Sequence, residues 1–322
     1  MRDNLQQLSR HDIGQVTFNV PLSEHSSWRI GGLADMFVEP GSTQQVQNLI
    51  KELQKYELPY ITIGGGSNIL FDDAGVRGVV VKIGQKLSRF SIENDFVTAQ
   101  AGSFVPCLVR SLGCAGLSGL EHAIGIPGTL GGLILMNGGS QRQGIGCRVD
   151  RVWAVDHYGE LIEYDQRACN FSFRCSVFQQ AKVVLIQARL KLDKGTSSTI
   201  RREMLEILRV RRGKFPMKQP NCGSVFLSDP SMYEAVGPPG SVIETCGFKG
   251  LQIGDAKISE QHANFIVNVS QASSRDVLEL ITQVRQGVFE ETGYRLNCEV
   301  KYATPACKLV PAHDPLDNHR IA

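Results

Sequence analysis

The feature that most constrains the fold is a glycine loop that follows directly on a short apolar strand. Tyr60-Ile61-Thr62-Ile63 runs into Gly64-Gly65-Gly66-Ser67-Asn68. Glycines let a backbone approach an anion and adopt positive φ, and Ser67 and Asn68 add side-chain donors. The loop is therefore a candidate phosphate site, although a plain turn would have the same composition. It does not match the dinucleotide fingerprint GxGxxG, because Ile69 takes the place of the last glycine.

A second glycine-rich segment, Gly125 to Gly132, is predicted to be a turn that leads into the N-terminus of a helix. The N–H groups at the start of a helix are a favourable place for an anion. Two such loops, each after strand structure, fit one pyrophosphate held between two halves of a domain. Composition and spacing alone do not identify the molecule that carries it.

Periodicity predicts a mixture of helices and strands. Apolar residues recur at helical spacing over 43–56 and over 274–291, where Ser273 and Asp276 are spaced as a capping box. Alternating residues predict a hairpin over 152–162. The order of these elements predicts an α/β or α+β fold.

The middle of the chain contains a predicted domain boundary. Residues 193–198 are polar, and a basic helix follows them. Residues after Ala303 carry prolines without periodicity, so a loose tail is expected there.

Composition excludes several classes of protein. The chain of 322 residues is long enough for two to three compact units. Its net charge of +2 provides no field to recruit nucleic acid or an anionic membrane. No apolar run approaches the roughly 20 residues that span a bilayer. The nine cysteines form no CxxC pair, so neither a zinc site nor a disulfide framework is expected, and cytoplasmic location follows.

Three later residues have reactive side chains, and each could equally have an ordinary structural role. Arg174 would by default be a solvated surface charge. Ser224 lies in a tight turn between small residues, where serine usually serves the turn itself. Glu299 is on the polar face of a strand predicted over 294–301, where an exposed glutamate is the default.

Seven motifs, in the same order, resemble those of the UDP-N-acetylenolpyruvoylglucosamine reductases, from about Ser23 to Lys301 and in the shorter subtype of that family. The motifs are Gly64 to Leu70, Gly125 to Gly132, Met136-Asn137-Gly138-Gly139, Arg174-Cys175-Ser176, Pro220 to Phe226, Ser259 to Phe265 and Glu299-Val300-Lys301.

The resemblance implies an α+β fold of the vanillyl-alcohol-oxidase type, in which two subdomains bind FAD and a smaller α+β domain binds the substrate. The corresponding division is 1–75, 76–195 and 196–303, with 304–322 as the tail. The flavin would be non-covalent, so His25 and His122 need no role as covalent anchors. The residues assigned to FAD are Gly64, Gly65, Gly66, Ser67, Asn68, Gly125, Ile126, Pro127, Gly128, Thr129 and Gly131.

The same resemblance implies the reaction. NADPH would provide the hydride that reduces UDP-N-acetylglucosamine enolpyruvate to UDP-N-acetylmuramate, a step of peptidoglycan synthesis on which cell shape and division depend. Arg174 and Glu299 would bind and polarise the substrate carboxylate, and Ser224 would donate the proton. The basic stretch 209–218 is assigned to the UDP phosphates, and 262–264 to shaping the substrate domain. The expected state is a monomer without nucleic acid or membrane partners.

The chain departs from the family pattern at three places. Phe173 replaces a common tyrosine, Cys222 replaces an alanine, and Leu227-Ser228-Asp229-Pro230 replaces lysine-asparagine-proline. A diverged paralogue acting on a related nucleotide sugar would show such changes. The residues are also compatible with an FAD oxidase of an alcohol or sugar, often with covalent flavin, and with a non-catalytic flavin- or nucleotide-binding module. A dehydrogenase that uses NADP alone fits them less well, because the GxGxxG spacing is broken.

Overall fold

The computed structural model describes residues 2–228 and 230–315. They form two compact units, each with a hydrophobic core of its own. Unit 1 consists of Met1–Phe18, Met36–Gly65 and Val79–Arg211, and unit 2 of Asn19–Asp35, Gly66–Gly78 and Arg212–Ala322. Both units contain helices and strands, which confirms the expected α+β class.

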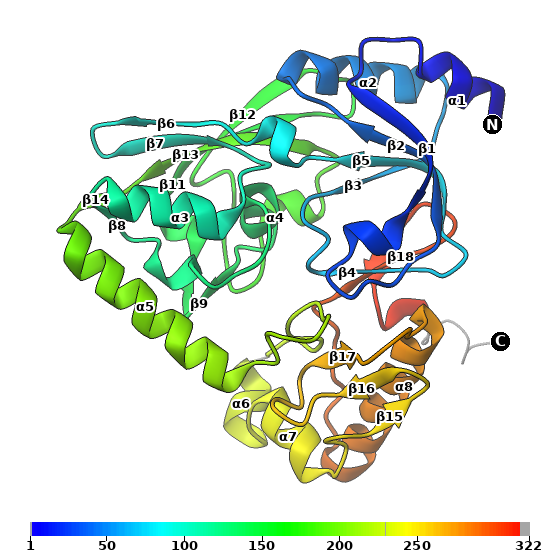
Figure 1. The fold of residues 1–322 in the computed structure, drawn as a ribbon, viewed down its shortest axis with the longest axis vertical. Coiled ribbons are helices and arrows are strands. Elements are labelled where there is room, and N and C mark those ends of the chain that lie inside the picture. Colours follow the sequence, from blue (N-terminus) through cyan, green and yellow to red (C-terminus); the bar gives the residue numbers. More distant parts are fainter. Residues whose placement is uncertain (1, 229, 316–322) are drawn as a thin grey trace. The chain divides into compact units, whose positions relative to one another are not determined.

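Unit 1 contains a five-stranded antiparallel sheet in the order β12-β11-β13-β7-β6. Its strands are β6 Phe90–Glu93, β7 Phe96–Gln100, β11 Val149–Val155, β12 Leu161–Asp165 and β13 Val184–Lys191. Pairing of β11 with β12 confirms the hairpin predicted over 152–162. Helix α4 (Leu130–Leu135) packs against β7 and β13, and α3 (Val105–Cys114) lies beside it (Figure 1).

A second sheet has the order β1-β2-β5-β3. It consists of β1 Gln15–Pro21, β2 Leu33–Glu39, β5 Val76–Lys82 and β3 Tyr60–Ile63, and β3 pairs with β5 in parallel. Helix α2 (Thr43–Lys55) confirms the first predicted helix, and the Ser42 hydroxyl accepts from the Gln45 N–H at its start. Its predicted apolar stripe is buried in the core of unit 1.

The remaining elements of unit 1 are short, apart from one long helix. They are α1 Arg2–Leu8, η2 Gln85–Leu87, β8 Leu117–Ser118, η3 Glu121–Ala123, β9 Gly139–Ser140, β10 Gln143–Gly144, η4 Ile145–Cys147, η5 Val177–Gln179, β14 Asp193–Lys194 and α5 Ser197–Lys214.

Helix α5 is the predicted basic helix, but it does not open a new unit. Its residues Ile200, Met204 and Ile207 are buried in the core of unit 1. Gly113 on α3 makes room for them, since a Cβ there would come 2.9 Å from both Ile200 and Met204 side-chain atoms. The change between units therefore comes after Arg211 rather than at 195/196. The other predicted domain limits stay predictions.

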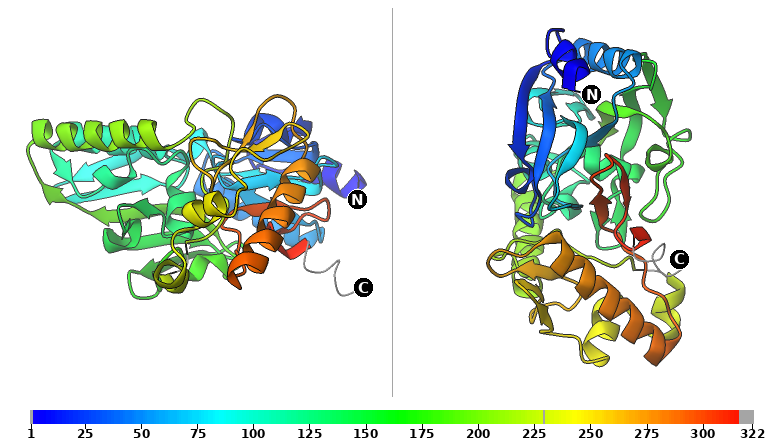
Figure 2. Two further views of the ribbon diagram at one scale, coloured as in Figure 1. Left: turned by 90° about the horizontal axis from the view of Figure 1, so that it is seen from below. Right: turned by 90° about the vertical axis from the view of Figure 1, so that its right-hand side faces the viewer.

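Unit 2 is built on helix α8 (Ser274–Thr292), which lies along the three-stranded sheet β15-β16-β17 (Figure 2). The predicted capping box is present, since Ser273 and Asp276 each accept from the other's backbone N–H. The other elements are η1 Leu22–His25, β4 Ile69–Phe71, α6 Pro230–Ala235, α7 Pro239–Thr245, β15 Gln252–Ile253, β16 Ala256–Ile258, β17 Ile266–Asn268, β18 Lys301–Ala303 and β19 Leu309–Pro311.

The prediction of a strand over 294–301 is wrong in its extent. Leu296, Cys298 and Val300 are buried as expected, but residues 294–300 form no regular strand and contain one isolated bridge, between Cys298 and Phe226. The regular strand is β18, which pairs with β4 and with β19. The expected tail is therefore ordered in its first part as the hairpin β18–β19, while residues 316–322, with His319, lie outside the described residues.

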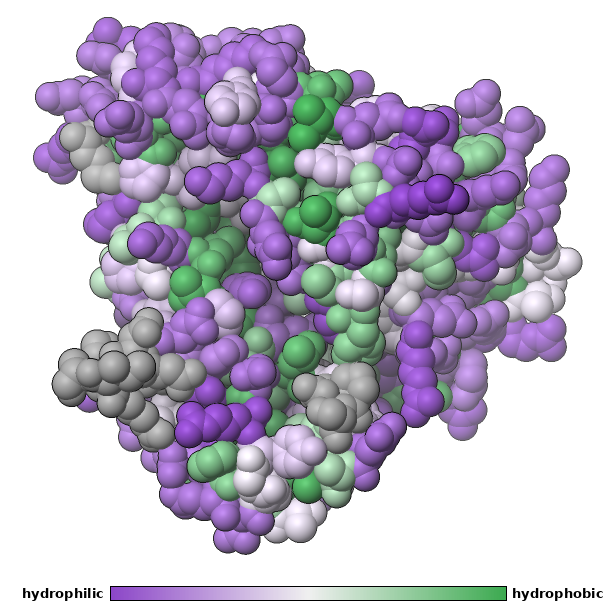
Figure 3. Space-filling view, turned by 180° about the vertical axis from the view of Figure 1, so that it is seen from behind, coloured by the Kyte–Doolittle hydropathy of each residue, from purple (hydrophilic) through white to green (hydrophobic). Residues whose placement is uncertain are grey.

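Among the described residues, no helix combines the length and apolar character needed to cross a bilayer. The face of the molecule in Figure 3 is mostly hydrophilic, with hydrophobic side chains in scattered patches. The nine cysteines are free thiols. No cluster of His, Cys, Asp or Glu within residues 2–228 and 230–315 could hold a metal ion.

Candidate active site

Gly64 and Gly65, the part of the first glycine loop that belongs to unit 1, lie against the second glycine loop. A Cβ on Gly64 would come 2.2 Å from the Thr129 hydroxyl oxygen, and one on Gly65 would come 3.3 Å from the Gly128 Cα. A side chain at Gly64 would therefore push the loops apart. The structure thus brings together residues from both segments that the sequence assigned to the cofactor.

The first loop has free backbone donors. In the part of the chain that the structure describes, the N–H groups of residues 64–68 donate to no other group. Gly66 has a φ of +64°, and a Cβ there would come 1.8 Å from the His25 carbonyl oxygen. Successive N–H groups around a left-handed residue form a concavity that suits a phosphate. The loop therefore fits the pyrophosphate of a dinucleotide cofactor.

The second loop differs, because several of its N–H groups are already used inside unit 1. Ile126 donates to Ala123 O at 3.0 Å, and Gly131 donates to Ala101 O at 2.8 Å. Pro127 has no N–H to offer. These three residues therefore shape the loop through packing and backbone bonds.

Gly131 in particular is required for close packing. A Cβ there would come 3.0 Å from the Ala101 Cβ. Its neighbour Leu130 also donates inward, to Ser103 O at 2.8 Å, so the first turn of α4 is not the open donor set that the sequence suggested. The N–H groups of Gly125, Gly128 and Thr129 have no acceptor among the described residues. These three remain available to a ligand.

A guanidinium group lies directly over the second loop. A Cβ on Gly125 would come 2.4 Å from Cδ and Nε of Arg211. Burial lowers the pKa of Arg211, and the positive charge of Arg174 lowers it further. Unit 1 thus brings the charges of two arginines together, one of them against Gly125, and this arrangement favours an anionic ligand.

Sequence reasoning assigned Arg211 only as one charge of the basic stretch 209–218. The helical spacing of this stretch distinguishes Arg211 from the other basic residues. Arg211 comes seven residues after Met204 and four residues after Ile207, so it lies on the same face of α5 as these two residues. That is the buried face of the helix. A cation on the buried face of an amphipathic helix indicates a local role rather than a solvated charge.

Arg174 lies in a tight two-residue turn of unit 1. Ser172 and Cys175 exchange both backbone hydrogen bonds at 3.1 Å, and Arg174 has a φ of +53°. Gln179 donates to Arg174 O at 2.9 Å, and Asn137 donates to Ser172 O at 2.7 Å. These bonds fix the turn and so limit where the guanidinium can reach. The side chain before it, Phe173, is exposed.

Ser224 lies in the predicted tight turn, in unit 2. Gly223 has a φ of +78°, and its N–H donates to Asn221 Oδ1 at 2.9 Å. Both backbone polar groups of the next residue, Val225, are hydrogen-bonded. Its N–H donates to Asn264 O, and its carbonyl oxygen accepts from Glu299 N–H. The serine turn and the Glu299 segment are thereby neighbours.

The Glu299 segment also contacts the end of the first glycine loop within unit 2. Asn68 Nδ2 donates to Glu299 O at 3.3 Å, and Lys301 N–H donates to Asn68 O at 3.0 Å. The Cys222 thiol lies 3.7 Å from Gly66 O, and burial raises the pKa of this thiol to about 12. Three predicted motifs therefore meet in unit 2: the end of the glycine loop, the serine turn and the Glu299 segment.

The predicted trio is divided between the units. Ser224 and Glu299 belong to unit 2, and Arg174 belongs to unit 1. Neither unit alone contains all three residues.

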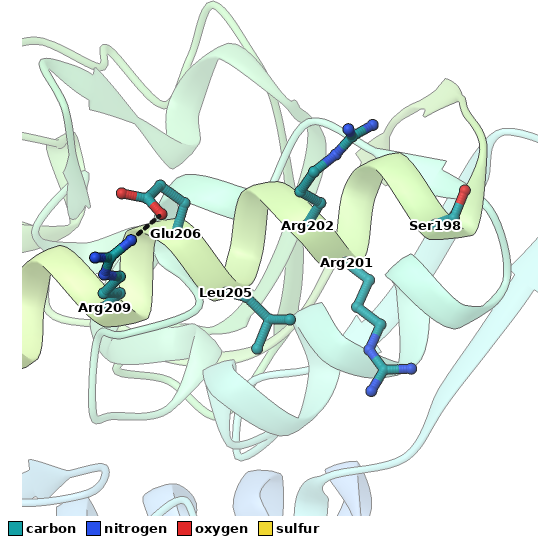
Figure 4. Close-up of a pocket in the computed structure, with 6 residues that line it drawn as sticks. All are labelled: Ser198, Arg201, Arg202, Leu205, Glu206 and Arg209. Carbon is teal, nitrogen blue, oxygen red and sulfur yellow. Dashed lines mark ion pairs between the residues drawn. The ribbon is translucent and has the colours of Figure 1, made fainter.

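A separate pocket on α5 contains no predicted catalytic residue. It has a volume of about 530 Å³ and is lined by Ser198, Arg201, Arg202, Leu205, Glu206 and Arg209. Figure 4 shows Arg201 and Arg202 pointing to opposite sides of the helix, and Arg209 paired with Glu206 at 3.8 Å. These charges do not converge on a common ligand.

His122, for which no role as a covalent flavin anchor was expected, is buried in unit 1. His122 is only 3% exposed, and its Nε2 has no partner among the described residues; the same holds for Oε1 of Glu121. Burial lowers the pKa of His122. The charge of Glu121 raises this pKa, and the charge of Arg148 lowers it.

Two family models match this chain. One, described as an FAD binding domain, matches residues 34–165, which include both glycine loops. The other, described as the C-terminal domain of UDP-N-acetylenolpyruvoylglucosamine reductase, matches residues 215–303, which include Ser224 and Glu299. With the named relatives below, these matches define the class of the protein as an FAD-dependent oxidoreductase.

The relatives identify the family. UDP-N-acetylenolpyruvoylglucosamine reductase 1 of Corynebacterium glutamicum is 46% identical over 298 residues, 92% of this chain and 89% of its own. The Bacillus subtilis reductase is 36% identical and covers 94% of this chain and 98% of its own. The chain belongs to the UDP-N-acetylenolpyruvoylglucosamine reductase family, as the motifs predicted.

A solved structure supports the fold assignment. The crystal structure of the Thermus caldophilus UDP-N-acetylenolpyruvylglucosamine reductase matches with a TM-score of 0.75 and 30% identity, over 89% of this chain and 98% of that one. The fold expected from the motifs, an FAD-binding part with a further α+β part, is thereby confirmed.

Proposed function

We propose that the protein uses NADPH and non-covalent FAD to reduce UDP-N-acetylglucosamine enolpyruvate to UDP-N-acetylmuramate in peptidoglycan synthesis. The observation that carries the proposal is the 46% identity, over 92% of the chain, to a reductase of that name. The neighbouring Ser224 and Glu299 motifs in unit 2 support it.

FAD, when bound, supplies the hydride-transfer chemistry that no side chain can provide. Its pyrophosphate is assigned to the free N–H groups of the first glycine loop and of Gly125, Gly128 and Thr129. Gly64 and Gly65 allow the two loops to approach each other closely enough for this. Ile126, Pro127 and Gly131 contribute by shaping the second loop.

The substrate carboxylate is assigned to Arg174 and Glu299. A guanidinium can bind a carboxylate through two parallel hydrogen bonds, which both orients the substrate and withdraws charge from it. Glu299 in its protonated form would donate to the same carboxylate. Charge that develops on the carboxylate during hydride transfer is then stabilised by groups already in place.

Ser224 is assigned as the donor of the proton that completes the reduction. A hydroxyl is a weak acid, so its contribution depends on being held at the reacting carbon and on a path that restores its proton. The backbone bonds around Val225 provide such a fixed position.

The stretch 209–218 is assigned to the UDP phosphates. Arg211 is the member with the clearest local environment, because it is largely buried beside Gly125 and Arg174. We place the reaction in the cytoplasm, where nucleotide-linked precursors and NADPH are present together, and expect the enzyme to act as a monomer.

Anaerobic half-reactions test the proposal. The purified protein is titrated with NADPH while the flavin absorbance band is followed, and the sugar nucleotide is then added. Bleaching by NADPH and rapid recovery with the sugar nucleotide are expected. Recovery that fails with this compound but occurs with another nucleotide sugar would indicate the diverged paralogue. A flavin that stays on the denatured chain, or a protein that cannot be loaded with flavin, would contradict the proposal.

A further inference from the structure

The segment that follows Ser224 is held by one buried side chain of unit 2. The amide of Asn264 accepts from Phe226 N–H and donates to Phe226 O, each at 2.9 Å. Its own backbone carbonyl accepts from Val225 N–H, also at 2.9 Å. Asn264 therefore makes three hydrogen bonds to the two residues that come directly after the serine.

On its other side, the same segment is bonded to the chain around Glu299. Glu299 N–H donates to Val225 O, and Leu227 N–H donates to Asn297 O, both at 2.8 Å. Residues 225–227 are thus fixed between Asn264 and the Glu299 segment. The location of Ser224 relative to Glu299 depends on both contacts.

Burial makes these bonds hard to replace. Val225, Phe226 and Asn264 are all less than 5% exposed, so water cannot satisfy the backbone groups if the amide is removed. Loss of the amide would leave the segment free to shift. Displacements on the order of 1 Å at a reacting group can reduce a rate about 10²-fold.

We propose that Asn264 is a positioning residue that holds the Ser224 turn in register with Glu299 for proton donation to the substrate. The proposal rests on the function proposed above. It assigns to the asparagine of the motif Ser259 to Phe265 a specific effect on the second half-reaction, in addition to its contribution to the fold.

The same unit contains a matched control. Asn268 is as buried as Asn264, at 4% exposed, and its amide makes three hydrogen bonds, one more than the amide of Asn264. It donates to Trp28 O and accepts from the N–H groups of Ser270 and Ala272. None of these partners belongs to the serine turn. Asn264→Ala therefore removes two buried side-chain hydrogen bonds and Asn268→Ala removes three, but only the first removes bonds to Phe226. The bond from Val225 N–H to the backbone carbonyl of residue 264 stays in both variants.

The experiment measures both anaerobic half-reactions by stopped flow, together with thermal unfolding. Both variants should unfold at lower temperature. Only Asn264→Ala should slow flavin reoxidation by UDP-N-acetylglucosamine enolpyruvate, by about 10²-fold. Flavin reduction by NADPH, which needs no proton from Ser224, should stay within a factor of about two in both variants. Equal slowing of reoxidation in the two variants, or no slowing in either, would overturn the proposal.

A double-mutant cycle shows whether Asn264 acts through the serine. In a Ser224→Ala background, Asn264→Ala should cause no further slowing of reoxidation, because the group that it positions is absent. Independent, multiplicative losses would mean that Asn264 acts elsewhere. Should Asn264→Ala not fold, Asn264→Asp, which has the same shape and cannot donate to Phe226 O, takes its place with the same expectations.

The results also separate this inference from the proposed function. If the wild-type flavin is not reoxidised by the sugar nucleotide, the proposed function is wrong and the inference fails with it. If the wild type and Ser224→Ala behave as expected while Asn264→Ala matches Asn268→Ala, only the inference is wrong.

Discussion

The two units carry candidate site residues of different kinds. In unit 1 they are the backbone N–H groups of Gly64, Gly65 and the second glycine loop, with two guanidinium groups, and these are suited to hold anions. In unit 2 they are a serine in a fixed turn and a glutamate on the adjoining segment, which are suited to proton transfer. Changes in unit 1 should therefore act mainly on binding, and changes in unit 2 mainly on the rate of one step. The following predictions test that division, from the largest expected effect to the smallest.

Replacement of Ser224 by alanine should give the largest change in rate. Loss of a general acid typically costs about 10²–10⁴ in rate, and we expect this loss in flavin reoxidation by the sugar nucleotide. FAD content and reduction by NADPH should be unchanged, because the serine is not among the residues assigned to them. Ser241→Ala, an exposed serine of α7, is the control. A loss of bound FAD in Ser224→Ala would contradict the division in which changes in unit 2 act on the rate of one step.

Arg174→Lys should act on substrate binding. Lysine keeps the charge but loses the fork that binds a carboxylate through two bonds. Hydrogen bonds to charged groups contribute about 1.5–3 kcal/mol, so KM for the sugar nucleotide should rise about 10- to 100-fold. Arg201→Lys on the outer side of α5 should leave KM unchanged. A normal KM in Arg174→Lys would remove this residue from the substrate site.

Two glycine-to-alanine substitutions should show whether FAD binding depends on the close contact between the glycine loops. A Cβ at Gly64 would come 2.2 Å from the Thr129 hydroxyl, so Gly64→Ala should force the loops apart and lower FAD occupancy. At Gly132 the nearest contact is that same hydroxyl at an ordinary 3.6 Å. Gly132→Ala should therefore retain FAD and gain up to about 1 kcal/mol of stability, since alanine suits a helix better than glycine. Flavin absorbance per chain and urea unfolding measure the two effects.

The smallest effect concerns the pH dependence of stability, and it should involve both units. Burial lowers the pKa of His122 in unit 1 and of His262 in unit 2 below the ordinary 6.5. As pH falls through 6.5, the unfolded chain binds protons that the folded chain resists, so the free energy of unfolding decreases. Urea unfolding at pH 5.5 and 7.5 should show this loss, and His122→Leu should reduce it. An unchanged difference in that variant would assign the loss to other groups.

The sequence was most informative where structure depends on neighbours along the chain. Helices α2 and α8 were predictable together with their caps, because an apolar stripe and a serine before it are local signals. The glycine loops were found for the same reason. The sequence did not show that the two loops differ in how many N–H groups are available to a ligand. Gly131 N–H, for example, donates to Ala101 O, which comes from a distant stretch of chain.

The candidate site shows the same limit. Ser224, Glu299 and Arg174 came from motifs, whereas the role of Asn264 depends on a contact with Phe226 across 38 residues. The pairing of β18 with β4 was missed because β4 lies more than 200 residues earlier in the chain. Residues brought together only by tertiary pairing leave no periodic signal in the sequence.

The interleaving of the two units has a consequence for how the protein is made on the ribosome. Unit 1 has all its parts once Arg211 has emerged, whereas unit 2 needs both residues 19–35 and the chain beyond 212. Trp28 is fully buried and its indole N–H donates to Ile266 O at 2.7 Å, so this acceptor is made only after most of the chain has been translated. We therefore expect the Trp28 side chain to be exposed during synthesis, as an apolar surface to which a chaperone can bind.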